Sequence, residues 1–131
     1  MRRRHFFAGS ILAVGSVSTG IYLYRSNEPS PEELAVVEVA GKLAELPGAV
    51  RFGETFSKRL RKDGQDIRSA QSISSFLADT HGAFDSSTIG RILDKQILAD
   101  LERDQIQRVH GWYLTRTELD LCALASAAID A

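Results

Sequence analysis

Two histidines beyond the amino terminus and one cysteine are the side chains of this 131-residue chain best suited to metal or nucleophilic chemistry. His81 and His110 could meet in the fold to bind a metal ion, but the sequence has neither a close histidine pair nor a His-Glu-x-x-His motif. Cys122 is the one cysteine, which excludes an internal disulfide and a cysteine-rich zinc or iron–sulfur site. The neighbours of Cys122 are small and apolar, so we expect a buried, inert thiol. Because the sequence has no close histidine pair, we also expect no metal site.

No motif predicts catalysis or a bound cofactor. The sequence lacks a glycine-rich phosphate loop, a dinucleotide fingerprint and a Gly-x-Ser-x-Gly nucleophile turn. Glu118 could act as a general acid or base, but its position at a helix start explains it structurally. A Ser-His-Asp triad is still possible, because the residues of such a triad come together in the fold from distant sequence positions. A small hydrolase is therefore the third functional alternative.

The segment from Trp112 to Glu118 combines an aromatic pair with a helix-starting motif. Thr115 and Glu118 form a capping box, in which each side chain accepts a hydrogen bond from the other residue's amide. Trp112 and Tyr113 either present a stacking surface to a ligand or partner, or seal the edge of the core. Aromatic residues concentrate binding energy at interfaces. The candidate interface residues are therefore Trp112, Tyr113, Thr115 and Glu118.

The elements that would position these residues are mainly helical. Apolar side chains recur at helical spacing, and cap and stop residues bound each run. The predicted elements are a helix from Pro31 to a stop at Pro47-Gly48, a helix over 49–62, a helix from 67 to 77 or 79, a helix from 85 or 86 to 103, an extended segment over 105–114 and a last helix over 115–129. We expect a mainly all-α domain over 31–131, folded as a four- to five-helix bundle and preceded by a linker over 26–30.

Two of these helices carry specific expectations for their faces. In the third, Ile73, Phe76 and Leu77 should point into the core. Four cations end the second helix, namely Lys58, Arg59, Arg61 and Lys62. Cations suit the negative end of a helix dipole, so we expect a solvated face there rather than an anion-binding site.

Residues 1–25 have the pattern of an export signal, with basic residues ahead of an uncharged stretch. The order Arg-Arg-His-Phe-Phe, starting at Arg3, resembles the twin-arginine signal, and glycine, serine and threonine dilute the uncharged stretch as is common in such signals. The expected signal residues are Arg3, Arg4 and Phe6, and the expected first partner is the twin-arginine translocase.

The same stretch is long enough to stay in a membrane. As a helix, residues 6–24 would span about 28 Å, close to the thickness of a hydrocarbon core. An uncleaved anchor in the inner membrane and a cleaved leader therefore both stay open. Either one places the body of the protein in the periplasm, soluble or tethered.

Charge is distributed unevenly along the chain. Four of the sixteen basic residues lie within the first 25 positions, whereas all seventeen acids lie beyond them. The remaining chain carries a net charge of −5. Binding to nucleic acid requires a surplus of lysine and arginine, so we expect no nucleic-acid partner.

Residues 100–124 resemble the carboxyl-terminal motif of a group of small bacterial twin-arginine-signal proteins. The shared pattern is V-x-G-W-x-L-[ST]-x-T-E-x-x-x-x-A-L, and this chain matches it from Val109 to Leu124. His110 occupies a position that is often small or acidic in that group. The resemblance implies export and the helical topology, and it implies no particular chemistry.

An export signal without a visible catalytic or cofactor set indicates a non-catalytic accessory subunit. We expect a small periplasmic or membrane-tethered chain that docks on a larger exported protein. An oxidoreductase is the favoured partner, because the twin-arginine pathway carries folded, often cofactor-loaded enzymes together with their small partners. The alternative is a free-standing periplasmic ligand-binding module with a pocket between helices near His81 and His110.

Overall fold

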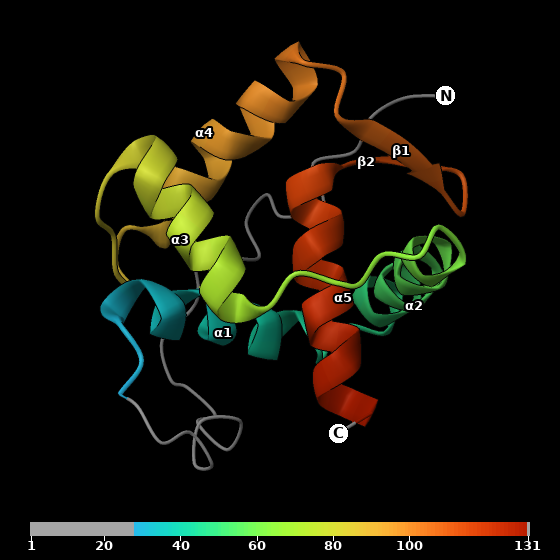
Figure 1. Cartoon of the computed structure of the whole chain (residues 1–131), viewed down its shortest axis with the longest axis horizontal. Helices are drawn as coiled ribbons and strands as arrows, with labels where there is room; N and C mark the ends of the chain where they lie inside the picture. The colour runs from blue at the N-terminus through green and yellow to red at the C-terminus, as the bar shows by residue number, and fades with distance from the viewer. Residues whose placement is uncertain (1–27, 131) are drawn as a thin grey trace.

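Five helices and one β-hairpin make up the described part of the chain, residues 28–130 of the computed structural model (Figure 1). The elements are α1 (Pro31–Leu43), α2 (Pro47–Lys62), α3 (Ala70–His81), α4 (Ile89–Glu102), β1 (Ile106–Val109), β2 (Trp112–Thr115) and α5 (Arg116–Asp130). The prediction of a mainly helical fold with a short extended segment is therefore confirmed. The predicted signal or anchor, residues 1–25, lies outside the described residues. Among the described helices, none is both long and apolar enough to cross a bilayer.

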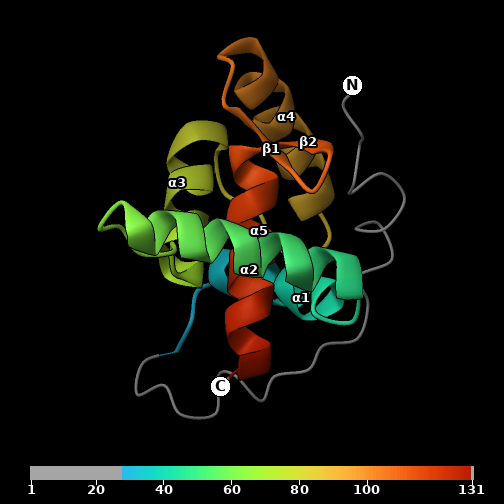
Figure 2. The same cartoon turned by 90° about the vertical axis from the view of Figure 1, so that its right-hand side faces the viewer.

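Helix α5 lies at the centre of the fold. Figures 1 and 2 show α1, α2 and α4 arranged around it, and all three contact it, as does strand β2. Leu119, Leu121 and Cys122 point in three different directions around the helix axis, yet all three are fully buried. A helix that buries every side belongs in a core. α3 lies further out, where it packs on α1 and α4.

The closest approach of two helices is the crossing of α2 over α5, which Figure 2 shows face-on. A β-carbon added to Gly53 of α2 would lie 2.0 Å from the carbonyl oxygen of Cys122 in α5, far inside van der Waals contact. The hydroxyl of Ser57, one turn further along α2, donates a 2.8 Å hydrogen bond back to the Gly53 carbonyl and so needs no partner on α5. Glycine at position 53 therefore sets how closely these two backbones can approach.

Cap residues explain where the first two helices begin and end. The hydroxyl of Ser30 accepts a 3.1 Å hydrogen bond from the Glu33 amide, as its position ahead of a proline and two glutamates predicts. α2 begins at Pro47, two residues earlier than predicted, because proline suits the first helical turn. Gly64 follows the end of α2 with a φ of +75°, a backbone conformation that glycine adopts without strain.

The predicted core face of α3 needs one correction. Ile73 and Leu77 are buried as expected, but Phe76 is 39% exposed, and the guanidinium of Arg68 lies 5.5 Å from the centre of its ring. The buried side of the helix also includes Ala70, and Phe76 lies roughly 110° around the axis from the middle of that side. Its ring therefore packs against a cation at the surface.

Two further helix boundaries differ from the predictions. α3 begins at Ala70, because the Ser69 hydroxyl accepts a hydrogen bond from the Ser72 amide, and it extends to His81, beyond the predicted end at 77 or 79. α4 begins only at Ile89, since the four residues before it form a turn around Asp85. Hydrogen bonds from Ser87 to the Asp85 carboxylate lower the pKa of that carboxyl group.

The extended segment folds back on itself as an antiparallel hairpin. Val109 pairs with Trp112 and Arg108 with Tyr113, so that two residues form the turn. Both turn residues have positive φ, 50° at His110 and 85° at Gly111, which defines a tight turn whose twist matches that of the paired strands. The sequence predicted an extended segment broken at this point, but it did not predict the pairing.

Candidate functional site

The predicted capping box is present at the start of α5. The Thr115 amide donates to Glu118 Oε1 at 2.9 Å, and the Glu118 amide donates to Thr115 Oγ1 at 3.3 Å. Both side chains are fully buried. A partner on the surface could not contact them, so the part they play is to start α5 and fix the direction in which β2 enters it. Of the four candidate interface residues, Trp112 and Tyr113 are the two that a partner can reach.

A second buried carboxylate supports the same helix start, and the sequence analysis missed it. Asp100 Oδ2 accepts hydrogen bonds from the amide and the hydroxyl of Thr117, at 2.9 and 2.6 Å. Its Oδ1 accepts one from the Gln96 side-chain amide at 2.8 Å. An acid near a helix amino terminus also complements the helix dipole. The i, i+4 spacing of Gln96 and Asp100 was the available signal, but nothing local linked that pair to a helix far along the chain.

The network ends at His81, whose Nε2 lies 2.8 Å from Gln96 Oε1. The amide nitrogen of Gln96 must face the Asp100 carboxylate, which only accepts hydrogen bonds when ionised. The amide oxygen of Gln96 therefore faces His81, and the N–H group at His81 Nε2 donates a hydrogen bond to that oxygen. This chain of bonds ties the end of α3 through α4 to the start of α5, which is a structural role for the histidine.

Trp112 and Tyr113 face opposite sides of the hairpin, because successive side chains alternate along a strand. Trp112 lies on the side of the buried Val109, and its ring packs edge-on against Phe52 of α2 with 5.8 Å between ring centres. This is the core-sealing alternative that the sequence left open. Tyr113 lies on the outer side, directly across from Arg108, and is half-buried.

Contacts along α2 hold the hairpin in place. His110 Nε2 lies 2.8 Å from Thr55 Oγ1 at the hairpin turn. Further along β1, the Arg59 guanidinium donates to the Arg108 carbonyl at 3.0 Å, which satisfies a backbone acceptor on the outer edge of the strand. We call the group formed by the exposed Arg59, Arg108 and His110 and the half-buried Tyr113 the hairpin surface.

A cleft of about 240 Å³ adjoins the hairpin surface, between the carboxyl half of α2, β1 and the first residue of α5. Its charged lining residues are Arg59, Lys62, Asp63 and Arg116. The Arg116 guanidinium stacks over Phe56, 5.2 Å from the ring centre, and donates to Asp120 at 2.9 Å. Cations remain in excess in the cleft even with this bond, so a negatively charged group is the ligand that suits it.

Burial dominates the electrostatics of two groups on α5. It raises the pKa of the Asp120 carboxyl, although the nearby guanidinium groups of Arg116 and Arg68 act in the opposite direction. Burial, together with the negative charge of Glu118, also raises the pKa of the Cys122 thiol, so almost no thiolate forms near neutral pH. The prediction of a buried cysteine is confirmed, and its chemistry is that of an inert thiol.

The two histidines do not share a site. His81 contacts Gln96 of α4, whereas His110 contacts Thr55 of α2, and neither lines the two clefts along α2. Within residues 28–130, no group of three or more histidine, cysteine or acidic side chains is arranged to hold a metal ion.

Comparisons with protein-family models, curated proteins and solved structures found no match to this chain. The resemblance to the twin-arginine-signal group therefore rests on the sequence motif. The motif residues have clear structural uses in this fold, because Gly111 makes the hairpin turn and Thr115 and Glu118 start the central helix.

Proposed function

We propose that the chain is a non-catalytic accessory subunit that docks on a larger exported protein through the hairpin surface. The observation that carries this proposal is the outward-facing pair of Arg108 and Tyr113 on a hairpin that is fixed to α2. Tyrosine and arginine are the residue types that contribute most to binding at protein interfaces, together with tryptophan.

The rigidity of this surface supports a docking role. Contacts at the turn, at the Trp112 ring and at the Arg108 carbonyl hold the turn half of the hairpin against α2. A surface that is already ordered loses little conformational entropy when it binds, so more of its contact energy appears as affinity. Two paired strands alone would be only marginally stable in water, and packing on α2 removes that weakness.

The charge around the surface indicates the nature of the partner. Cations dominate the 240 Å³ cleft beside Arg59, whereas the chain beyond the leader is acidic overall. We therefore propose that the partner presents an acidic patch and inserts a carboxylate side chain into this cleft. Association should weaken as ionic strength rises, because salt screens attraction between exposed charges.

The proposed compartment rests on the leader. The paired arginines followed by Phe6 favour passage through the twin-arginine translocase into the periplasm, where the body is soluble or tethered by residues 6–24. An exported oxidoreductase fits the partner class, because this pathway carries folded enzymes.

Site-specific crosslinking tests the docking proposal. The full chain carries a photo-crosslinking amino acid at Tyr113 in one sample and at the exposed Lys95 of α4 in another, both at native abundance. We expect one larger exported protein to crosslink at position 113 and not at position 95. The purified pair should then bind, with Tyr113→Ala and Arg108→Gln each weakening binding at least tenfold and Lys95→Gln leaving it unchanged. Equal capture at both positions, or binding that ignores Tyr113→Ala, would overturn the proposal.

Export is tested separately with a reporter fused behind residues 1–30. Replacement of both Arg3 and Arg4 by lysine keeps the charge but removes the guanidinium groups. We expect the reporter to reach the periplasm with the natural leader and to stay in the cytoplasm with the double replacement. A reporter that crosses equally well in both cases would overturn the assignment of the leader.

A further inference from the structure

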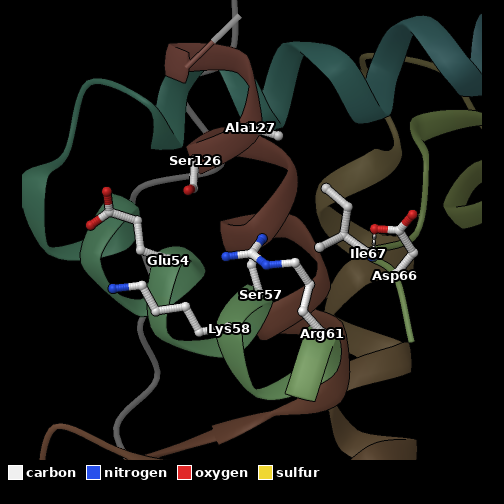
Figure 3. Close-up of a pocket in the computed structure, with 8 residues that line it drawn as sticks. All are labelled: Glu54, Ser57, Lys58, Arg61, Asp66, Ile67, Ser126 and Ala127. Carbon is white, nitrogen blue, oxygen red and sulfur yellow. Dashed lines mark hydrogen bonds between the residues drawn. The ribbon is translucent and has the colours of Figure 1, made fainter. Parts of the chain in front are cut away.

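A second cleft, separate from the hairpin surface, opens between α2, the carboxyl end of α5 and the loop that follows α2 (Figure 3). Its volume is about 330 Å³, at the lower end of the range for small-molecule sites in proteins. α2 contributes Lys58 and Arg61, α5 contributes Ser126, and the loop contributes Asp66 and Ile67.

Ser126 is the unusual residue of this cleft. It is only 4% exposed, and Figure 3 shows its hydroxyl oxygen directed into the open space. Among the residues whose side chains the structure describes, none forms a hydrogen bond with that hydroxyl. Ser57 also lines the cleft, but its hydroxyl is already bonded to the Gly53 carbonyl. A hydroxyl that is held in place and has no hydrogen bond within the described part of the chain is well suited to bind a ligand.

The charges around the cleft are balanced. Arg61 extends its guanidinium into the middle of the cleft, whereas Lys58 extends its ammonium group toward the side where Glu54 lies (Figure 3). Over residues 28–130, neither cation is within salt-bridge distance of an acid. Glu54 and Asp66 stand on the two sides, and the one hydrogen bond that Asp66 accepts within the described part of the chain comes from the adjacent Ile67 amide, at 3.2 Å. Two carboxylates would repel phosphate or a dicarboxylate, whereas a molecule with one charge of each sign finds a partner for both.

We propose that this cleft binds a zwitterionic α-amino acid with a short apolar side chain. The ligand carboxylate accepts hydrogen bonds from the Arg61 guanidinium and the Ser126 hydroxyl, which lie on opposite sides of the same space. The ammonium group pairs with one of the two flanking carboxylates, Glu54 or Asp66, which stand on opposite sides of the cleft. Ile67 and Ala127 provide the apolar wall for the side chain. This ligand site goes beyond the accessory role, and the two share no side chain.

Calorimetric titration of the purified full chain tests the proposal, with L-leucine and L-alanine as probes. We expect saturable binding of at least one of them. Arg61→Gln should weaken it at least tenfold, because one charge-assisted pair is lost, and Ser126→Ala should weaken it about fivefold. Arg51→Gln is the matched control, since it removes the same charge from an exposed position of the same helix that lines neither cleft. It should bind as the natural chain does.

Analogues that lack one charge decide between a zwitterion site and a simple anion site. 4-Methylpentanoate has the leucine skeleton without the ammonium group, and it should bind at least tenfold more weakly than L-leucine. Inorganic phosphate should not compete. Equal binding of 4-methylpentanoate, competition by phosphate, or the absence of saturable amino-acid binding at millimolar concentration would each overturn the proposal. Circular dichroism of each variant establishes that it is folded before its binding is compared.

Discussion

The two ends of α5 use their polar side chains in opposite ways. At the amino end, Thr115, Thr117 and Glu118 are buried and bonded to one another or to Asp100. At the carboxyl end, Ser126 is equally buried but bonds to no group of residues 28–130 and faces an open cleft. Burial alone therefore does not distinguish a structural polar residue from one that is available to a ligand. The two kinds differ in whether the buried side chain already has a hydrogen-bond partner.

The largest expected effect comes from the middle of α5, on which both ends depend. Gly53→Ala places a methyl group against the Cys122 carbonyl, so the helices must separate, and we expect the free energy of unfolding to fall by about 3 kcal/mol. Urea unfolding of the variant and the natural chain measures this change in the free energy of unfolding. Gly41→Ala in α1 is the control, because a methyl group there meets nothing within 4 Å, and it should leave stability equal or higher. Similar losses in both variants would show that the close crossing is unimportant.

Removal of the buried acid at the amino end should have the next largest effect. Asp100→Ala leaves the Thr117 amide and the Gln96 side chain without their acceptor, and we expect a loss of about 2 kcal/mol. Ser126→Ala, at the other end of the same helix, should change the free energy of unfolding by less than about 0.5 kcal/mol. The comparison of the two ends fails if the serine variant is the less stable of the two.

Glu118→Gln tests the charge of the capping box with little change of shape. The variant keeps an oxygen that can accept from the Thr115 amide, but it loses the negative charge next to the helix amino terminus. We expect a loss of about 1 kcal/mol in urea unfolding at neutral pH. A variant as stable as the natural chain would contradict an electrostatic origin.

The smallest effect concerns Asp120. Burial raises its pKa in the folded state, so this group holds its proton to higher pH in the folded chain than in the unfolded one. Its contribution to stability is therefore greatest in acid and declines as pH rises from about 3.8 through the folded pKa. Unfolding measured across that range should show the natural chain losing stability relative to Asp120→Asn as pH rises. A relative gain would reverse the assigned sign.

The order of elements and the start of α5 were predictable because their causes are local. Capping residues, prolines and the Thr115–Glu118 box act within a few positions of the sequence, and the structure places their hydrogen bonds as expected. Phe76 was misplaced because helical spacing alone does not say which of two adjacent apolar directions meets a neighbour. Which side of α3 is buried depends on the elements that pack against it, and these come from other parts of the chain.

The surfaces were less predictable than the helices. Trp112 and Tyr113 form one pair in the sequence, but strand alternation sends them to opposite sides of the hairpin once Arg108 is known to pair with Tyr113. The cleft around Ser126 combines residues more than sixty positions apart. No local pattern links them, because the contact exists only after glycine at position 53 has let α2 settle on α5.

The burial of Cys122 provides an intrinsic probe of the core around α5. Its thiol is fully buried, and no other cysteine in the chain competes for a reagent. A maleimide can reach it only when the packing around α5 opens, so the rate of labelling reports that opening in the unmodified protein. The same measurement distinguishes the folded chain from the unfolded chain without any engineered label.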